Sequence, residues 1–178
     1  IPAASLWALT ASDALGVGEA VSRRIVSELN RAAGAGGMVG GQALDLLGEG
    51  QHLDSTELDR QHGMKTGALL TVSLVIGGLA AGASDTAIAG LESFGRGIGL
   101  AFQVTDDILD ATEVAADLGK HPSDGLHDKS TYVSLYGLEE ATRRARVLAE
   151  EATEALRGAG IDAPALMALA SYVVERKR

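Results

Sequence analysis

Residues 102–110, FQVTDDILD, place three aspartates inside an apolar run of the chain. On a helix, Asp110 lies beside both Asp106 and Asp107, because positions three and four apart are neighbours. Like charges at that spacing destabilise a helix by roughly 0.2–0.5 kcal/mol per pair. A solvated acidic face is one interpretation, but such a face usually mixes Lys, Glu and Gln. The apolar surroundings therefore favour a second interpretation, in which the three carboxylates bind cations.

The chemistry of the acidic motif favours a magnesium site. Mg²⁺ takes oxygen ligands and is typically held by one or two carboxylates together with substrate phosphates. A DDxxD array on one helical face provides such ligands and leaves coordination positions open for a diphosphate. We therefore predict that Asp106, Asp107 and Asp110 bind Mg²⁺.

The rest of the chain is predicted to be helical, since no sustained period-two alternation indicates strands. With 178 residues and 46% hydrophobic composition, residues 1–178 are expected to form a single all-α domain. Gly16, Gly34 and Gly158–Gly160 mark helix ends, and Asp162 is predicted to cap the last helix before Pro164. The predicted helices are 4–15, 19–33, 37–48, 55–62, 65–82, 85–116, 131–136, 138–158 and 163–177.

Composition excludes several classes of protein. A net charge of −9 disfavours binding to nucleic acid or anionic lipid, and the absence of cysteine excludes disulfides and thiolate metal sites. Residues 66–84 carry no charge, but their glycines and hydroxyls and the lack of aromatic anchors favour a buried core helix over a membrane span. A cytoplasmic location is expected. The chain starts at Ile1 in a helix-like stretch, and we expect an N-terminal part of a longer protein to be missing.

Basic and hydroxyl side chains near apolar helices are candidates for binding phosphate. Lys65 and Thr66 begin the predicted helix 65–82, where the helix N-terminus would attract an anion. Lys120 and Lys129 lie in the polar loop that follows the acidic motif and could neutralise diphosphate charge. For each lysine, a solvated side chain is the alternative.

Two glycine-rich stretches remain. In MVGGQALDLL, Gln42 and Asp45 are polar positions on an apolar helix, where they either orient ligands or pair with each other in the core. The glycines at 95, 97 and 99 in GRGIGL do not follow a strand, as a dinucleotide-binding loop requires. They are better explained by close contact between helices.

Taken in order, five motifs resemble the C-terminal half of a trans-isoprenyl diphosphate synthase, the polyprenyl synthetase family of farnesyl and geranylgeranyl diphosphate synthases. They are GGQALDL, HGMKTGALL, GLAFQVTDDILD, DLGKHPSDGLHDKSTYVSLYG and a basic C-terminus, and they cover nearly all of residues 1–178. The resemblance implies the C-terminal part of an isoprenoid-synthase-type helical bundle. It also implies a homodimer and a Mg²⁺ cofactor.

The resemblance assigns roles to individual residues. Asp106, Asp107 and Asp110 match the family's second aspartate-rich motif, which holds Mg²⁺ against the allylic diphosphate, and Gln103 matches the glutamine that lines the allylic pocket. The residues that match the family's lysine–threonine motif, loop lysines and G-G-Q-x-x-D helix are Lys65, Thr66, Lys120, Lys129, Gln42 and Asp45.

The function implied is a prenyl transfer that condenses isopentenyl diphosphate with an allylic diphosphate, giving a farnesyl or geranylgeranyl product. The family's first aspartate-rich motif is absent from these 178 residues, so we expect a fragment carrying about half of the active site. A non-catalytic subunit of a heteromeric synthase is the main alternative. A di-iron bundle is a weaker one, since Glu49 and His52 supply a single E-x-x-H.

Overall fold

The computed structural model describes residues 2–118 and 130–176, with side chains described over 3–113 and 130–176. These ranges contain helices and no strand, which confirms the all-α prediction. In chain order they are α1 (Pro2–Ala14), α2 (Glu19–Ala33), α3 (Met38–Leu47), α4 (Ser55–His62), the π-helical segment η1 (Gly63–Gly67), α5 (Ala68–Ala80), α6 (Asp85–Leu118), α7 (Tyr132–Tyr136), α8 (Leu138–Gly158) and α9 (Pro164–Glu175).

The helix ends largely follow the sequence signals. Gly16 and Gly160 adopt positive φ angles of 68° and 70° just after α1 and α8, a conformation that glycine adopts without strain. The predicted cap at Asp162 is wrong. Helix α9 begins with Pro164, so Ala163 occupies the N-cap position and no side chain caps the helix.

The predicted start of a helix at residue 65 is also wrong. His62 and Gly67 both have right-handed helical backbone angles, so α4 continues through η1 into α5 without a break. The result is one helix, Ser55–Ala80, of 26 residues. Lys65 and Thr66 therefore lie inside a helix, and the predicted N-terminus of their own helix does not exist at this point.

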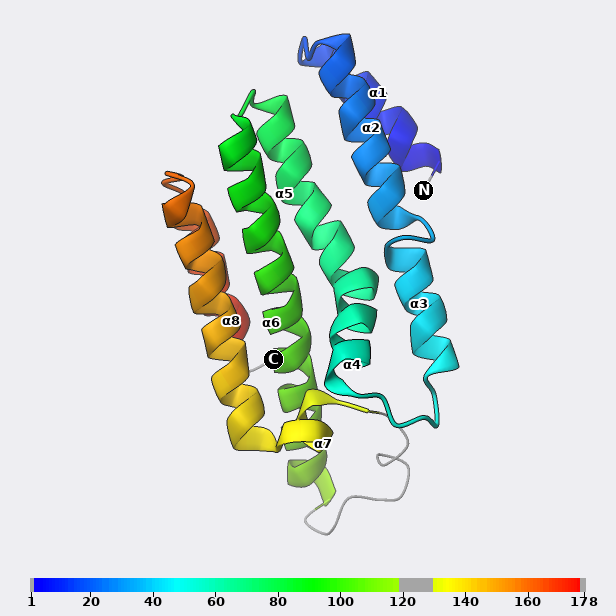
Figure 1. Ribbon diagram of the computed structural model, residues 1–178, viewed down its shortest axis with the longest axis vertical. Helices are drawn as coiled ribbons and strands as arrows, with labels where there is room; N and C mark the ends of the chain where they lie inside the picture. Colours follow the sequence, from blue (N-terminus) through cyan, green and yellow to red (C-terminus); the bar gives the residue numbers. More distant parts are fainter. Residues whose placement is uncertain (1, 119–129, 177–178) are drawn as a thin grey trace.

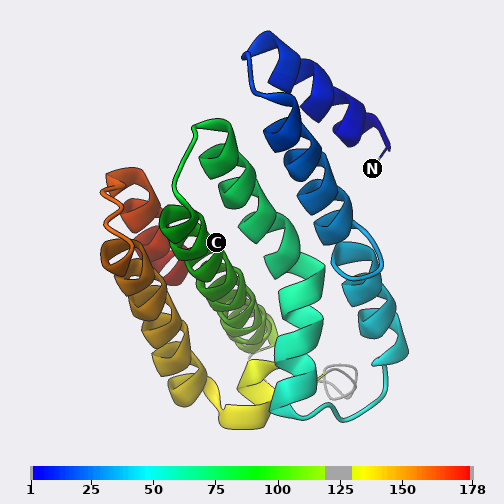
Figure 2. The same ribbon diagram turned by 45° about the horizontal axis from the view of Figure 1, so that its top comes forward.

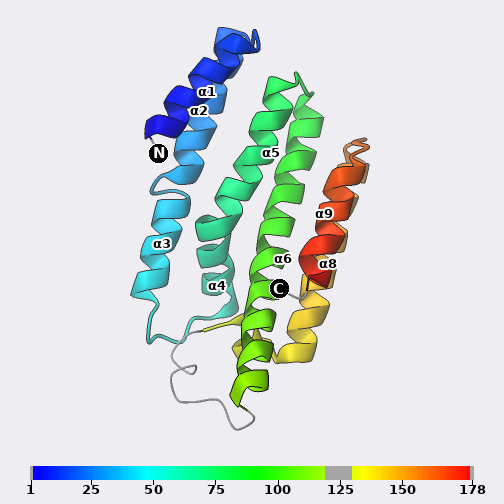
Figure 3. The same ribbon diagram turned by 180° about the vertical axis from the view of Figure 1, so that it is seen from behind.

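Helix α6 lies at the centre of the bundle. It packs between α5 and α8, and α9 contacts both α6 and α8 (Figure 1, and from behind in Figure 3). Figure 2 shows the order of the helices, from α8 and α9 on one side through α6 and α5 to α2 and α1 on the other. Helix α3 contacts η1, which brings the GGQALDL motif against the lysine–threonine motif.

Glycines allow the backbones of α5 and α6 to touch. A Cβ atom added at Gly95 would lie 2.6 Å from Cα of Thr71, and one at Gly99 would lie 2.7 Å from Cα of Gly67. Both distances are far shorter than ordinary van der Waals contact. The prediction that GRGIGL serves close helix contact is confirmed.

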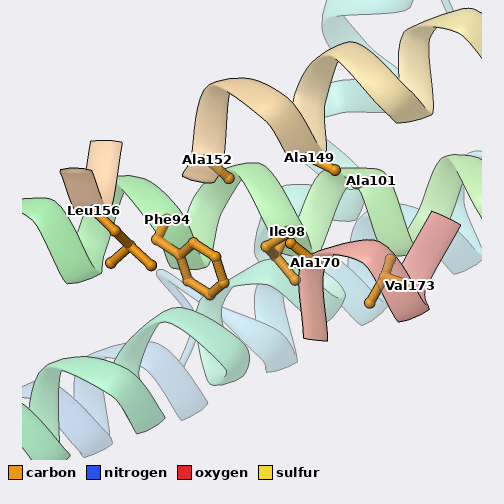
Figure 4. Close-up of a cluster of buried hydrophobic side chains, with 8 residues drawn as sticks. All are labelled: Phe94, Ile98, Ala101, Ala149, Ala152, Leu156, Ala170 and Val173. Carbon is orange, nitrogen blue, oxygen red and sulfur yellow. The ribbon is translucent and has the colours of Figure 1, made fainter. Parts of the chain in front are cut away.

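Small side chains build most of the core between α6, α8 and α9. Its buried cluster combines Phe94 and Leu156 with many alanines, and Figure 4 shows α6 and α8 meeting through such residues. The cluster consists of Phe94, Ile98, Ala101, Ala149, Ala152, Leu156, Ala170 and Val173. A chain with only 3% aromatic residues thus builds its core from closely approaching helices.

The Ser55–Ala80 helix is long and apolar enough to cross a membrane, judged by length and composition alone. Only 28% of its most apolar window is buried. Val72, Val75 and Leu79 belong to the core, whereas Leu70 is exposed. The helix is therefore buried along one face, and the absence of a membrane span stays a prediction.

Candidate active site

The acidic motif lies on α6, and its three carboxylates have different surroundings. Asp106 accepts hydrogen bonds from Gln103, at 3.2 Å, and from the guanidinium of Arg176. That guanidinium stacks over the ring of Phe102, with its carbon 4.1 Å from the ring centroid. Arg176 follows α9, so the end of the described chain is held against the first aspartate of the motif.

Asp107 turns toward the segment that leads into α7. One of its carboxylate oxygens accepts a hydrogen bond of 2.8 Å from the backbone N–H of Tyr132. Asp110, one turn further along α6, is exposed. Residue 106 thus faces the end of α9 while residue 107 faces the start of α7.

This divergence bears on the predicted magnesium site. Across residues 3–113 and 130–176, no three His, Asp or Glu side chains are grouped so as to hold a metal ion by themselves. The donors still suit Mg²⁺, because its usual sites beside phosphates take one or two carboxylates and leave the other positions to phosphate and water. Asp106 and Asp107 are each partly exposed and present hard oxygen ligands.

Lys65 is held in place by α3. Its ammonium nitrogen lies 2.5 Å from Oδ2 of Asp45, and the other oxygen of Asp45 accepts a 2.6 Å hydrogen bond from Gln61. The side chain of Asp45 is 10% exposed, whereas that of Lys65 is 31% exposed. Asp45 is therefore the counterion that orients a partly accessible lysine. Gln42 is exposed and does not join this group.

Gly41 makes the pairing of Asp45 with Lys65 possible. A Cβ atom at this position would lie 2.2 Å from the backbone nitrogen of Lys65 and 2.6 Å from its Cα. Helix α3 thus touches the backbone of η1 directly, and Asp45, one turn further along α3, reaches the lysine side chain. The π-helical turn that contains Lys65 and Thr66 is of a kind found frequently at functional sites.

The helix register brings the lysine–threonine motif and the glutamine–aspartate motif to the same end of the bundle. Helices α5 and α6 run antiparallel, with Gly99 against Gly67. Gln103 lies one turn after Gly99 on α6. Because the helices are antiparallel, moving from Gly99 to Gln103 corresponds on the neighbouring helix to moving from Gly67 back toward Lys65. Lys120 and Lys129, the two loop lysines predicted to meet diphosphate, lie outside the described residues.

A buried tyrosine network was not predicted as part of the site. The Tyr132 hydroxyl donates to Asp59 at 2.5 Å, and Arg144 donates to the other oxygen of Asp59 at 2.9 Å. Burial, followed by the hydrogen bond to Asp59, raises the pKa of the Tyr132 hydroxyl well above its usual value. The only sequence signal is that Tyr132 belongs to the STYVSLYG part of a recognised motif. Its partners come from distant parts of the chain.

A groove of about 680 Å³ runs between α2, α5 and α6. Val72, Val75 and Ile88 are among its apolar lining residues, and Arg24 and Arg96 are among its charged ones. Among the described residues, none of those predicted for the site lines this groove, but Asp59, which accepts the hydrogen bond of the Tyr132 hydroxyl, does.

Comparison with known proteins defines the class. Residues 5–160 match the Polyprenyl synthetase family, and the chain belongs to that family. It is 44% identical over 159 residues to the farnesyl diphosphate synthase of Escherichia coli K12, covering 86% of this chain and 53% of that protein. The chain thus spans about half the length of this relative.

Solved structures show the same fold. An FPP/GFPP synthase from Zymomonas mobilis superposes with a TM-score of 0.75 and 33% identity, covering 88% of this chain and 52% of that one. A geranyltransferase from Helicobacter pylori, solved with magnesium and isoprenyl diphosphate, gives a TM-score of 0.69 and 32% identity over 88% of this chain and 52% of its own. The isoprenyl diphosphate synthase fold is therefore shown for this chain.

Proposed function

We propose that the protein to which this chain belongs is a Mg²⁺-dependent prenyltransferase that joins isopentenyl diphosphate to an allylic diphosphate. The observation that carries the proposal is the register of α5 and α6, which sets Lys65 and Thr66 at the same end of the bundle as Gln103 and Asp106. A lysine, a hydroxyl, an amide and carboxylates are the groups that a metal-bound diphosphate requires. Relatives named as farnesyl diphosphate synthases support the same reaction.

In this reaction the C–O bond of the allylic diphosphate breaks and pyrophosphate departs with the bonding electrons. The alkene of isopentenyl diphosphate then forms the new C–C bond, and loss of a proton completes the product. Bound Mg²⁺ would neutralise charge on the leaving diphosphate, with Asp106, Asp107 and Asp110 as its proposed protein ligands. A product of farnesyl or geranylgeranyl length is part of the proposal.

The chain's own residues contribute orientation and charge. Because Asp45 holds the Lys65 ammonium in one place, little reorganisation is needed when a diphosphate oxygen arrives. Gln103 lies one turn before Asp106 on α6 and donates a hydrogen bond to its carboxylate, which helps to fix the orientation of that carboxylate. Arg176 forms an ion pair with Asp106 and so offsets part of the charge of this carboxylate.

The remaining expectations are part of the same proposal. We propose a cytoplasmic homodimer, and the exposed Leu6 and Trp7 on α1 provide apolar surface consistent with association. Light scattering coupled to size-exclusion chromatography measures the oligomer. A monomer at all concentrations would contradict the dimer without bearing on the chemistry.

Product analysis tests the enzymatic proposal. Protein expressed from its complete reading frame is incubated with Mg²⁺, isopentenyl diphosphate and labelled dimethylallyl or geranyl diphosphate. Dephosphorylated products are then separated by reversed-phase chromatography. Elongated products that disappear with EDTA are expected. If no allylic substrate is elongated while the folded protein is present, the proposed function is wrong.

A further inference from the structure

Tyr132 links two carboxylates that lie on different helices. Its side chain is completely buried, and its hydroxyl donates to Asp59 on α4. Its backbone N–H donates to Asp107 on α6. Asp59 therefore helps to hold Tyr132 in place, and Tyr132 in turn fixes one carboxylate oxygen of Asp107 in the acidic motif.

The side chain of Tyr132 is fixed on several sides. The ring of His62 stacks on it with centroids 5.6 Å apart, and the guanidinium carbon of Arg144 lies 5.7 Å from its centroid. Arg144 also donates to Asp59 at 2.9 Å, which holds the carboxylate that accepts the tyrosine hydroxyl. The network thus ties α4, α7 and α8 to one another.

The backbone around Tyr132 needs such support. Helix α7 has only five residues, too few to be stable by itself. Just before it, Ser130 accepts a hydrogen bond from the backbone of Leu53 and donates one to that of Gln51. Together with the Asp59 contact, these bonds set where the Tyr132 N–H points.

We propose that Asp59 is a positioning residue that acts through Tyr132 to orient Asp107 for its cation. The inference rests on the proposed function, because it concerns the role of Asp107 as a metal ligand. A carboxylate with one oxygen fixed by an N–H donor presents its other oxygen in a defined direction. Loss of outer partners that orient metal ligands typically weakens metal affinity 10–100-fold.

Two matched variants test this role. Tyr132→Phe removes the hydroxyl that reaches Asp59 but keeps the ring and the backbone N–H. Tyr136→Phe is the control, because the Tyr136 ring stacks on Tyr132 and its hydroxyl makes no hydrogen bond within the described residues. Mn²⁺ binding is measured by electron paramagnetic resonance in the presence of pyrophosphate, on full-length protein whose folding is checked by circular dichroism.

We expect Tyr132→Phe to weaken Mn²⁺ binding by up to about tenfold, because the direct partner of Asp107, the Tyr132 N–H, is kept, and we expect Tyr136→Phe to leave it unchanged. Asp59→Asn is expected to weaken it as well, and it carries the test if Tyr132→Phe does not fold. The Mg²⁺ concentration for half-maximal turnover should rise in the same variants. A purely structural role would instead lower thermal stability and leave Mn²⁺ affinity at the wild-type value, which would overturn the inference.

The wild-type titration separates this inference from the function on which it rests. Wild-type protein that binds no Mn²⁺ with pyrophosphate present would overturn the proposed function and the positioning role together. Wild-type binding combined with unchanged affinity in a folded Tyr132→Phe or Asp59→Asn variant would overturn the positioning role alone.

Discussion

Replacing Gly41 by alanine tests how the lysine of the site is held. The added Cβ would lie 2.2 Å from the backbone nitrogen of Lys65, whereas ordinary contact begins at 3.4 Å. The three nearest atoms, N and Cα of Lys65 and the carbonyl carbon of Met64, all belong to the backbone, so no side chain can rotate away. Helix α3 must therefore move from η1 by about 1.2 Å.

Two consequences follow from that displacement. Overpacking of this kind costs typically about 1–3 kcal/mol. For a domain of this size, each kcal/mol lowers Tm by about 2–4 °C. The ion pair between Lys65 and Asp45, now 2.5 Å long, would also stretch beyond hydrogen-bonding distance unless the side chains follow.

The assay combines thermal unfolding with calorimetric titration of pyrophosphate in the presence of Mg²⁺. We expect Gly41→Ala to lower both Tm and pyrophosphate affinity. Gly77→Ala is the matched control, because Gly77 is an exposed helical glycine on α5 with no atom within 4 Å of an added Cβ. The control should gain roughly 0.5–1 kcal/mol from improved helix propensity. A Gly41→Ala protein as stable as wild type, with unchanged pyrophosphate affinity, would refute the reasoning.

Three further predictions concern charged and titrating groups. Asp107→Ala in the full-length protein should reduce kcat by orders of magnitude in the product assay, and near-normal turnover would contradict its proposed role as a metal ligand. Lys65→Met should lower the free energy of unfolding, measured with urea, by about 1–3 kcal/mol, because Asp45 is left nearly buried without its counterion. Adding Asp45→Asn should recover part of that loss. If the losses of the two single variants simply add in the double variant, this prediction is wrong. Because burial raises the folded-state pKa of Tyr132, its contribution to stability is complete below about pH 10 and is lost as pH rises above that value. The free energy of unfolding, measured with urea, should therefore fall less steeply above pH 10 in Tyr132→Phe than in wild type or Tyr136→Phe. An equally steep fall in all three proteins would contradict this prediction.

Local signals were sufficient for most of the helices. Glycines that end helices, and hydrophobic spacing between them, depend on neighbouring residues, so they can be read along the chain. The error at residue 65 has a physical reason. A π-helical turn widens a helix without breaking it, and no residue type in GMKTG is specific to that geometry. The error at Asp162 arises because Pro164 fixes the first helical position. The N-cap position therefore falls on Ala163, one residue after Asp162.

The partners of the site residues were harder to predict, because they come from distant parts of the chain. Asp59 meets a tyrosine 73 residues later and an arginine 85 residues later. Nothing in the sequence near Asp59 distinguishes it from other acidic residues on helices. Arg176 reaches Asp106 across 70 residues, and only its place in a basic C-terminus marked it out. Family resemblance supplied the site residues, and the fold supplied their contacts.

The spacing within GGQALDL is explained by what it does to Lys65. Gly41 and Asp45 are four positions apart, so they share one face of α3. The glycine brings the helix into backbone contact with η1, and the aspartate one turn later binds the ammonium. At Gly67, the last residue of η1, Gly99 brings α6 into close contact as well.

The π-helical turn that carries the lysine is thus contacted by two helices through glycines, by α3 at Lys65 and by α6 at Gly67. This favours a role for the lysine in which its position, and not only its charge, matters. A lysine that served only to attract anions would work equally well on a mobile surface loop. Such a lysine would need neither the contact at Gly41 nor a nearly buried counterion. The Asp45 carboxylate in fact lowers the net attraction of Lys65 for a second anion. Asp45 is therefore best understood as a group that orients Lys65 at the proposed diphosphate site, at the cost of some attraction for the anion.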